Sequence, residues 1–258
     1  MKINQEMIVD NSRKIFAITI ILSIALPLII FSKPRLMYEK IDDGYAVRFY
    51  TFGLFNFTTA EIPESHNGLK VKELRGNSFS NMPLLKEVTL PNTITRIRGQ
   101  AFKNDLSLYK INLPNKLEYL GGGSFYNCKS LVYIELPDSL TYMGGETFYN
   151  ASKLENIVLS NKLQEIRGNT FEYCSSLKEI YIPDSVTRIG AHAFYENLSL
   201  SEVQISNNSS LTKIGSSAFR KCSKLYNITL PRTTLVDKRA FKESPTTISY
   251  FENISYYN

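Results

Sequence analysis

The residues best suited to metal or redox chemistry in this chain are three cysteines and two histidines. Cys128, Cys174 and Cys222 are widely separated in the chain, whereas zinc sites usually contain close pairs such as C-x2-C. His66 and His192 have no pattern of cysteines or acids around them. The sequence also has no G-x-S-x-G, H-E-x-x-H or P-loop motif. We therefore predict no metal site, no cofactor and no catalytic residue, and we do not expect an enzyme.

Recognition of another molecule is the second kind of chemistry that the side chains suggest. Tyrosines and acids recur beside an I-x-[LI] pattern, in positions that should face away from the core. Tyrosine supplies rigid, amphipathic contact area, and with acids nearby it suits a polar or basic peptide. The alternative is a solvated sheet face with no ligand. The predicted binding residues, on a concave sheet, are Tyr133, Glu135, Val158, Glu179, Tyr181, Glu202 and Gln204.

An internal repeat must position these side chains. Six phenylalanines follow one another at a constant interval of about 23 residues, which lies within the range that is typical of leucine-rich repeats. Two more phenylalanines follow at nearly the same interval, and leucines are regularly placed between them. The eight are Phe79, Phe102, Phe125, Phe148, Phe171, Phe194, Phe219 and Phe241.

Two aliphatic columns, on alternate positions, keep step with the phenylalanines, as in Ile134 and Leu136 or Ile157 and Leu159. Because side chains alternate along a strand, both columns point to one face. A single coil cannot bury such a face, but stacked coils can. The sequence therefore predicts a leucine-rich-repeat solenoid, α/β by convention but mostly short parallel strands and turns. We expect seven to eight coils of about 23 residues around a phenylalanine spine.

Small residues and cysteines occupy fixed slots of this repeat. Gly76, Gly99 and Gly122 begin a column of small residues, which predicts that neighbouring coils pass closely there. The cysteines occupy one slot in alternate coils, and equivalent Cα atoms two coils apart are ~9.6 Å from each other. A disulfide requires less than ~7 Å. We expect three free, buried thiols.

The N-terminal part carries a different signal. The run from Ile15 to Phe31 contains no charge, and as a helix it would span ~25 Å. We predict a transmembrane helix or signal anchor at residues 15–31, after a tail at residues 1–14, with the repeats outside the cell. A cleaved signal peptide lacks a suitable small-residue site here, and a buried helix of the soluble domain would be striped rather than apolar all round.

The repeat unit LPDSLTYMGGETFYNASKLENIV resembles the BspA-like (Treponema pallidum type) leucine-rich repeat family. The resemblance extends from about Glu61 to Phe251 and implies a short curved solenoid, commonly on cell surfaces. Members are often described as adhesins or host-interaction proteins. A solenoid also needs its end coils covered, and residues 45–50 alternate like a strand. We therefore expect an N-terminal β cap at residues 37–63, repeats at 64–251 with a last strand from Thr247 to Phe251, and a tail at 252–258.

These observations lead to an expected function. We expect a membrane-anchored, surface-displayed module that binds a protein or glycan partner, with residues 15–31 in the membrane. A membrane-tethered scaffold that faces the cytoplasm is the alternative, and an enzyme is a third. The net charge of +6 is spread along the chain, which favours solubility over a nucleic-acid partner.

Overall fold

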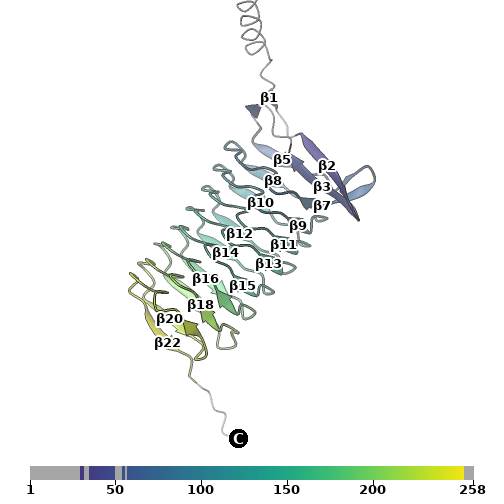
Figure 1. The fold of residues 1–258 in the computed structure, drawn as a ribbon. Helices are drawn as coiled ribbons and strands as arrows, with labels where there is room; N and C mark the ends of the chain where they lie inside the picture. The colour runs from purple at the N-terminus through teal and green to yellow at the C-terminus, as the bar shows by residue number, and fades with distance from the viewer. Residues whose placement is uncertain (1–29, 32–34, 50–53, 56, 253–258) are drawn as a thin grey trace, which may run out of the picture.

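Each repeat contributes one longer and one shorter strand, and the two kinds of strand stack into separate parallel ladders (Figure 1). The computed structural model describes residues 30–31, 35–49, 54–55 and 57–252. The strands run across the long axis of the solenoid, and the turns between them form its edges (Figure 1).

The long-strand ladder contains the I-x-[LI] pattern. Within the described residues it has nine strands where we predicted seven to eight coils, because the chain before the first regular repeat and after the last one adds a strand at each end. The strands are β5 (Thr59–Glu61), β8 (Glu87–Thr89), β10 (Lys110–Asn112), β12 (Tyr133–Glu135), β14 (Asn156–Val158), β16 (Glu179–Ile182), β18 (Glu202–Ile205), β20 (Asn227–Leu230) and β22 (Thr247–Tyr250). Hydrogen-bonded pairing joins β5–β8–β10, β12–β14, β16–β18 and β20–β22, with an interruption between successive groups.

The short-strand ladder lies on the other side of the coils. The sequence analysis did not predict these strands. They are β7 (Leu69–Leu74), β9 (Arg96–Ile97), β11 (Tyr119–Leu120), β13 (Tyr142–Met143), β15 (Glu165–Ile166), β17 (Arg188–Ile189), β19 (Lys213–Ile214) and β21 (Leu235–Val236).

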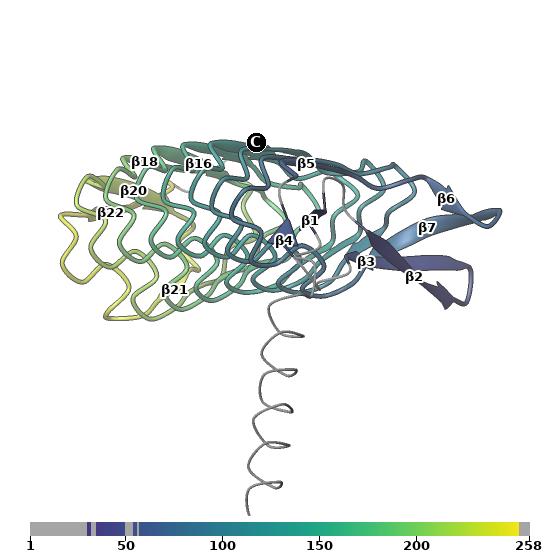
Figure 2. The ribbon, with the colours of Figure 1, turned by 90° about the horizontal axis from the view of Figure 1, so that it is seen from above.

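A hairpin extends the short-strand ladder at the N-terminal end. Strand β2 (Leu36–Ile41) pairs antiparallel with β3 (Gly44–Phe49), and β3 pairs in parallel with β7. Strand β6 (Ser65–His66) also pairs with β7, and these four strands project beyond the stacked coils (Figure 2). The strand predicted at residues 45–50 is therefore confirmed as β3, inside the predicted cap.

The phenylalanine spine is continuous. From Phe79 to Phe219 every ring is completely buried, and neighbouring centroids are 5.7 Å apart at the Phe79–Phe102 step and 4.9 Å apart at Phe194–Phe219. Phe241 continues the stack at 5.1 Å. Phe49, which the sequence did not assign to the spine, adds a further ring 6.0 Å from Phe79. Each repeat thus delivers its largest apolar group to the same internal row.

Close passage of neighbouring coils at the glycine column is confirmed. A Cβ atom on Gly122 would lie 2.9 Å from the carbonyl oxygen of Gly145, and one on Gly145 would lie 2.8 Å from that of Gly168. Contacts this short require the backbone to move, because the obstructing atom belongs to the main chain of the next coil.

The helix predicted for the membrane lies outside the described residues, apart from its last two. Those two form the short strand β1 (Ile30–Phe31), paired with β4 (Leu54–Phe55), so the predicted helical end at Phe31 is wrong. In the part of the chain that the structure describes, no helix has the length and apolar character needed to cross a bilayer.

Candidate functional site

The candidate site is the solvent-facing side of the long-strand ladder, which we call the outer face. Alternation along each strand creates it. In β12, Ile134 is 1% exposed and points into the core, while Tyr133 beside it is 51% exposed. Val158 and Tyr181 are exposed in the same way. All seven residues predicted to bind a ligand lie on this outer face, in β12, β14, β16 and β18, and all are exposed.

Strand register brings some of these side chains side by side. Glu135 pairs with Val158 across β12 and β14. Tyr181 pairs with Gln204 across β16 and β18, and in the same ladder Glu179 pairs with Glu202. Two carboxylates on directly opposed strand positions repel each other and destabilise the sheet. The middle of the outer face therefore contains an unfavourable acidic pair.

The ends of the outer face differ from its middle in charge pairing. Near the N-terminal end, Lys110 Nζ is 2.9 Å from Glu87 Oε2, and the hydrogen bonds of Tyr109 and Lys110 lower the pKa of Glu87. Among the ion pairs between described side chains, none involves Glu135, Glu179 or Glu202. The central carboxylates are thus left without a counter-charge.

The central acids do have neutral hydrogen-bond donors. The Tyr133 hydroxyl donates to Glu135 Oε2 at 3.2 Å, and Gln204 Nε2 donates to Glu202 Oε1 at 3.0 Å. Burial raises the pKa of Tyr133, and the bond to Glu135 raises it further. At neutral pH the tyrosine therefore stays a donor that holds the carboxylate in place.

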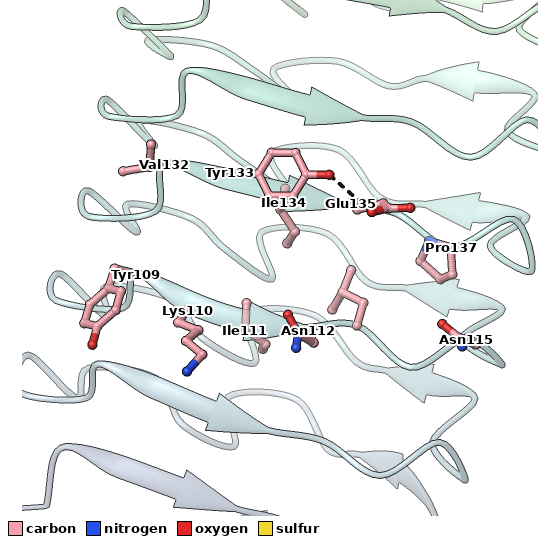
Figure 3. Close-up of a pocket in the computed structure, with 11 residues that line it drawn as sticks. Tyr109, Lys110, Ile111, Asn112, Asn115, Val132, Tyr133, Ile134, Glu135 and Pro137 are labelled. Atoms are coloured by element: carbon pink, nitrogen blue, oxygen red, sulfur yellow. Dashed lines mark hydrogen bonds between the residues drawn. The ribbon is translucent and has the colours of Figure 1, made fainter.

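A groove of about 490 Å³ opens on the outer face between β10 and β12 (Figure 3). Tyr109, Lys110 and Asn112 line it from one strand, and Tyr133 and Glu135 line it from the next (Figure 3). The groove combines apolar walls with a carboxylate, an arrangement that can hold the aliphatic stem and cationic head of a basic side chain.

On the short-strand side, Arg98 and Arg167 are engaged with groups of the protein. Arg98 Nη2 lies 2.8 Å from the buried carboxylate of Glu73, and this bond raises the pKa of Arg98. The Arg167 guanidinium lies over the Tyr142 ring and 3.3 Å from Glu165. These charges are partly satisfied within the protein, unlike the acids of the outer face.

The cysteines are free and completely buried, as predicted. Each Sγ lies 3.1 Å from the carbonyl oxygen of the spine phenylalanine one coil earlier, as Cys128 does with Phe102. Burial raises the pKa of all three thiols, that of Cys222 to about 12. Within the described residues, no group of His, Cys, Asp or Glu is arranged to hold a metal ion.

Asp105 is the most deeply buried of the acids that the sequence reasoning missed. Asp105 occupies the cysteine slot, three positions after Phe102, and is completely buried. Its Oδ1 accepts a hydrogen bond from the Met82 amide at 2.8 Å, and its Oδ2 has no partner. Burial raises the pKa of Asp105 to about 9. The repeat register held the signal, since the same slot contains cysteine in other coils.

Comparison with known proteins agrees with this geometry. The model of the BspA type leucine rich repeat region matches residues 46–174, 72–201 and 146–257, which together cover most of the chain. The chain belongs to the BspA-type leucine-rich repeat family. A comparison of this BspA-type protein with curated protein sequences found no match.

Solved structures share the same solenoid. A leucine-rich repeat protein of Treponema pallidum is 27% identical with a TM-score of 0.67, over 74% of this BspA-type chain and 87% of its own. A leucine-rich repeat protein from Bacteroides ovatus is 22% identical with a TM-score of 0.59, over 83% and 62% of the two chains. A leucine rich cell surface protein from Faecalibacterium prausnitzii is 20% identical with a TM-score of 0.54, over 86% and 76%. The last two likenesses establish the fold alone.

Proposed function

We propose that this protein is a binding module whose outer face, from β12 to β18, takes up a basic segment of a polypeptide partner. The observation that carries the proposal is the set of unneutralised carboxylates of Glu135, Glu179 and Glu202 beside exposed Tyr133 and Tyr181. A cationic partner would relieve the repulsion within the acidic pair, and the tyrosines offer rigid apolar area to its side-chain stems.

A stacked-coil scaffold suits this role. Its side chains project from strands whose inward neighbours are buried, so the outer face needs little ordering when a ligand binds. Among the described residues no group of His, Cys, Asp or Glu is arranged to hold a metal ion, and the ladder presents its recognition groups in a regular array. A glycan partner is less favoured. Sugars stack on the faces of aromatic rings, but here the tyrosines stand beside surplus carboxylates, which favour a cationic partner.

Fluorescence anisotropy with a labelled lysine-rich peptide and a glutamate-rich peptide of equal length tests the proposal. We expect the lysine-rich peptide to bind, more weakly as salt rises, and the glutamate-rich peptide not to bind. Tyr133→Ala and Tyr181→Ala should each weaken binding about tenfold, in the range of an interface anchor. Tyr250→Ala, which removes an exposed tyrosine of β22 outside the acidic middle, is the matched control. Equal binding of both peptides would contradict the proposal.

We also propose that the outer face is displayed at the cell surface. The support is the apolar segment at residues 15–31 and the likeness to a solved cell surface protein of the same fold. Protease treatment of intact cells should degrade the repeats, with a cytoplasmic protein as the protected control. Protection of the repeats until the cells are lysed would support the alternative, a tethered scaffold that faces the cytoplasm.

A further inference from the structure

Two of the three interruptions of the long-strand ladder lack a further backbone hydrogen bond. At most steps a backbone amide just before the long strand donates to the previous coil, as Tyr109 N does to Lys86 O at 3.0 Å and Ser201 N to Lys178 O at 2.9 Å. Among the described residues, no equivalent bond joins Val132 N to Tyr109 O or Tyr226 N to Ser201 O. The steps from β10 to β12 and from β18 to β20 therefore have the fewest backbone hydrogen bonds across the outer face.

A groove accompanies each of these two interruptions. The first is the 490 Å³ groove lined by Tyr133 and Glu135. The second, of about 360 Å³, lies between β18 and β20 and is lined by Tyr181, Glu202 and Gln204 among others. The first groove thus has two exposed tyrosines, Tyr109 and Tyr133, and the second has one, and each groove has one carboxylate without an ionic partner. The small lengthening of the repeat after β18 coincides with the second interruption.

Between the grooves, the outer-face column that starts at Glu135 carries no further charge. Val158, 48% exposed, lies beside Glu135 in register, and Tyr181 in β16 pairs with Gln204 in β18. Glu202 lies on the same strand as Gln204, two residues earlier. An extended chain that follows this column therefore passes Glu135, Val158 and Tyr181 and reaches Glu202 beside its end.

We propose that the two grooves are paired subsites that take two basic side chains of one extended peptide lying along the solenoid axis. This inference rests on the proposed function and specifies how far apart the two basic residues of the peptide are. Glu135 and Glu202 are three strands apart, which is ~14 Å, and these two interruptions are four strand spacings apart, ~19 Å. An extended chain advances ~3.3 Å per residue. The two basic residues therefore stand about four to six positions apart.

Labelled glycine–serine peptides with two lysines, separated by two, five or ten positions, test this spacing on the full-length protein. A peptide with one lysine is the reference. We expect the five-position peptide to bind about fivefold more tightly than the one-lysine peptide, the effect of one exposed charge pair. The two-position and ten-position peptides should gain little over the reference.

Variants assign each lysine to its groove. Glu135→Gln and Glu202→Gln should each abolish the advantage of the five-position peptide. When one lysine of that peptide is replaced by serine, the affinity of the peptide should no longer change with one of the two variants. It should still fall with the other variant. Glu118→Gln makes the same charge change at an exposed position beside β11, on the opposite side of the coils, and should change nothing.

Two results separate this inference from the function on which it rests. Affinity that rises with the number of lysines but not with their spacing overturns the paired subsites and leaves the basic-peptide proposal standing. No binding of any lysine peptide at low salt overturns both. Equal loss with Glu118→Gln would show a general charge effect and would also overturn the paired subsites.

Discussion

Replacing Asp105 with asparagine should stabilise the protein, although it alters a completely buried residue. Where another polar residue or a cysteine occupies this slot, its side chain donates to the carbonyl of the spine phenylalanine one coil earlier. Asn197 Nδ2 does so with Phe171 O at 2.7 Å, and Cys174 Sγ with Phe148 O at 3.1 Å. Asp105 can form such a bond, to Phe79 O, only when its carboxyl is protonated. An asparagine can form it at any pH and keeps the oxygen that accepts from the Met82 amide.

The size of the effect follows from the pKa. Burial raises the pKa of Asp105 from 3.8 to about 9, so the folded protein retains a proton that the unfolded chain releases. Stability is therefore fully present below the unfolded pKa and falls as pH rises toward the folded pKa. Each pH unit within this window costs about 1.4 kcal/mol. About three units lie between the ordinary pKa and neutrality, so the cost at pH 7 is ~4 kcal/mol.

Thermal unfolding of both proteins between pH 4 and pH 9 measures this cost. Near pH 4 the melting temperatures should be similar, and the advantage of Asp105→Asn should grow with each pH unit. The reverse change in the same slot, Asn197→Asp, should create a penalty with the same pH dependence. If Asp105→Asn melts at or below the unaltered protein at pH 8, or if the difference is independent of pH, the reasoning is refuted.

Three further predictions concern the core, the acidic pair and the thiols. Ala193, the residue before Phe194 of the spine, is completely buried, so Ala193→Leu should overpack the coil and lower stability by ~1–3 kcal/mol; unchanged melting would contradict the register. Glu202→Gln should raise the stability of the free protein by about 0.2–1 kcal/mol, because it removes a like charge opposite Glu179, and the gain should fade in high salt. The three buried thiols should resist a disulfide reagent at pH 8 in the folded protein and react fully after unfolding; labelling of the native protein would show that the coils open.

The repeat architecture was readable from the sequence because a solenoid is locally determined. Each coil contacts only its neighbours, so Phe102 and Phe125 could be placed in one stack from their spacing alone. The same logic predicted the free cysteines, the close passage at Gly122 and the outward direction of Tyr133 and Glu135. These features depend on which slot a residue occupies and on little else.

Other features depended on how the coils meet in three dimensions. The nine-strand count, the Phe49 ring at the head of the spine and the hairpin of β2 and β3 come from segments that do not follow the period. Asp105 was missed because aspartate is seldom fully buried, although it occupies the slot in which the cysteines were expected to be buried.

The sequence by itself determined the period, the spine and the alternation that makes Tyr133, Glu135 and Tyr181 face solvent, since these follow from side-chain direction along a strand. Tertiary structure alone decided which carboxylates lack a counter-charge and where the ladder opens into grooves. Both depend on how neighbouring coils meet. Lys110 and Glu87, for example, lie in adjacent coils, and the repeat pattern does not specify their ion pair. The shape of the solenoid follows from the repeat, whereas the charge pattern and the grooves of the outer face depend on residues that depart from the repeat.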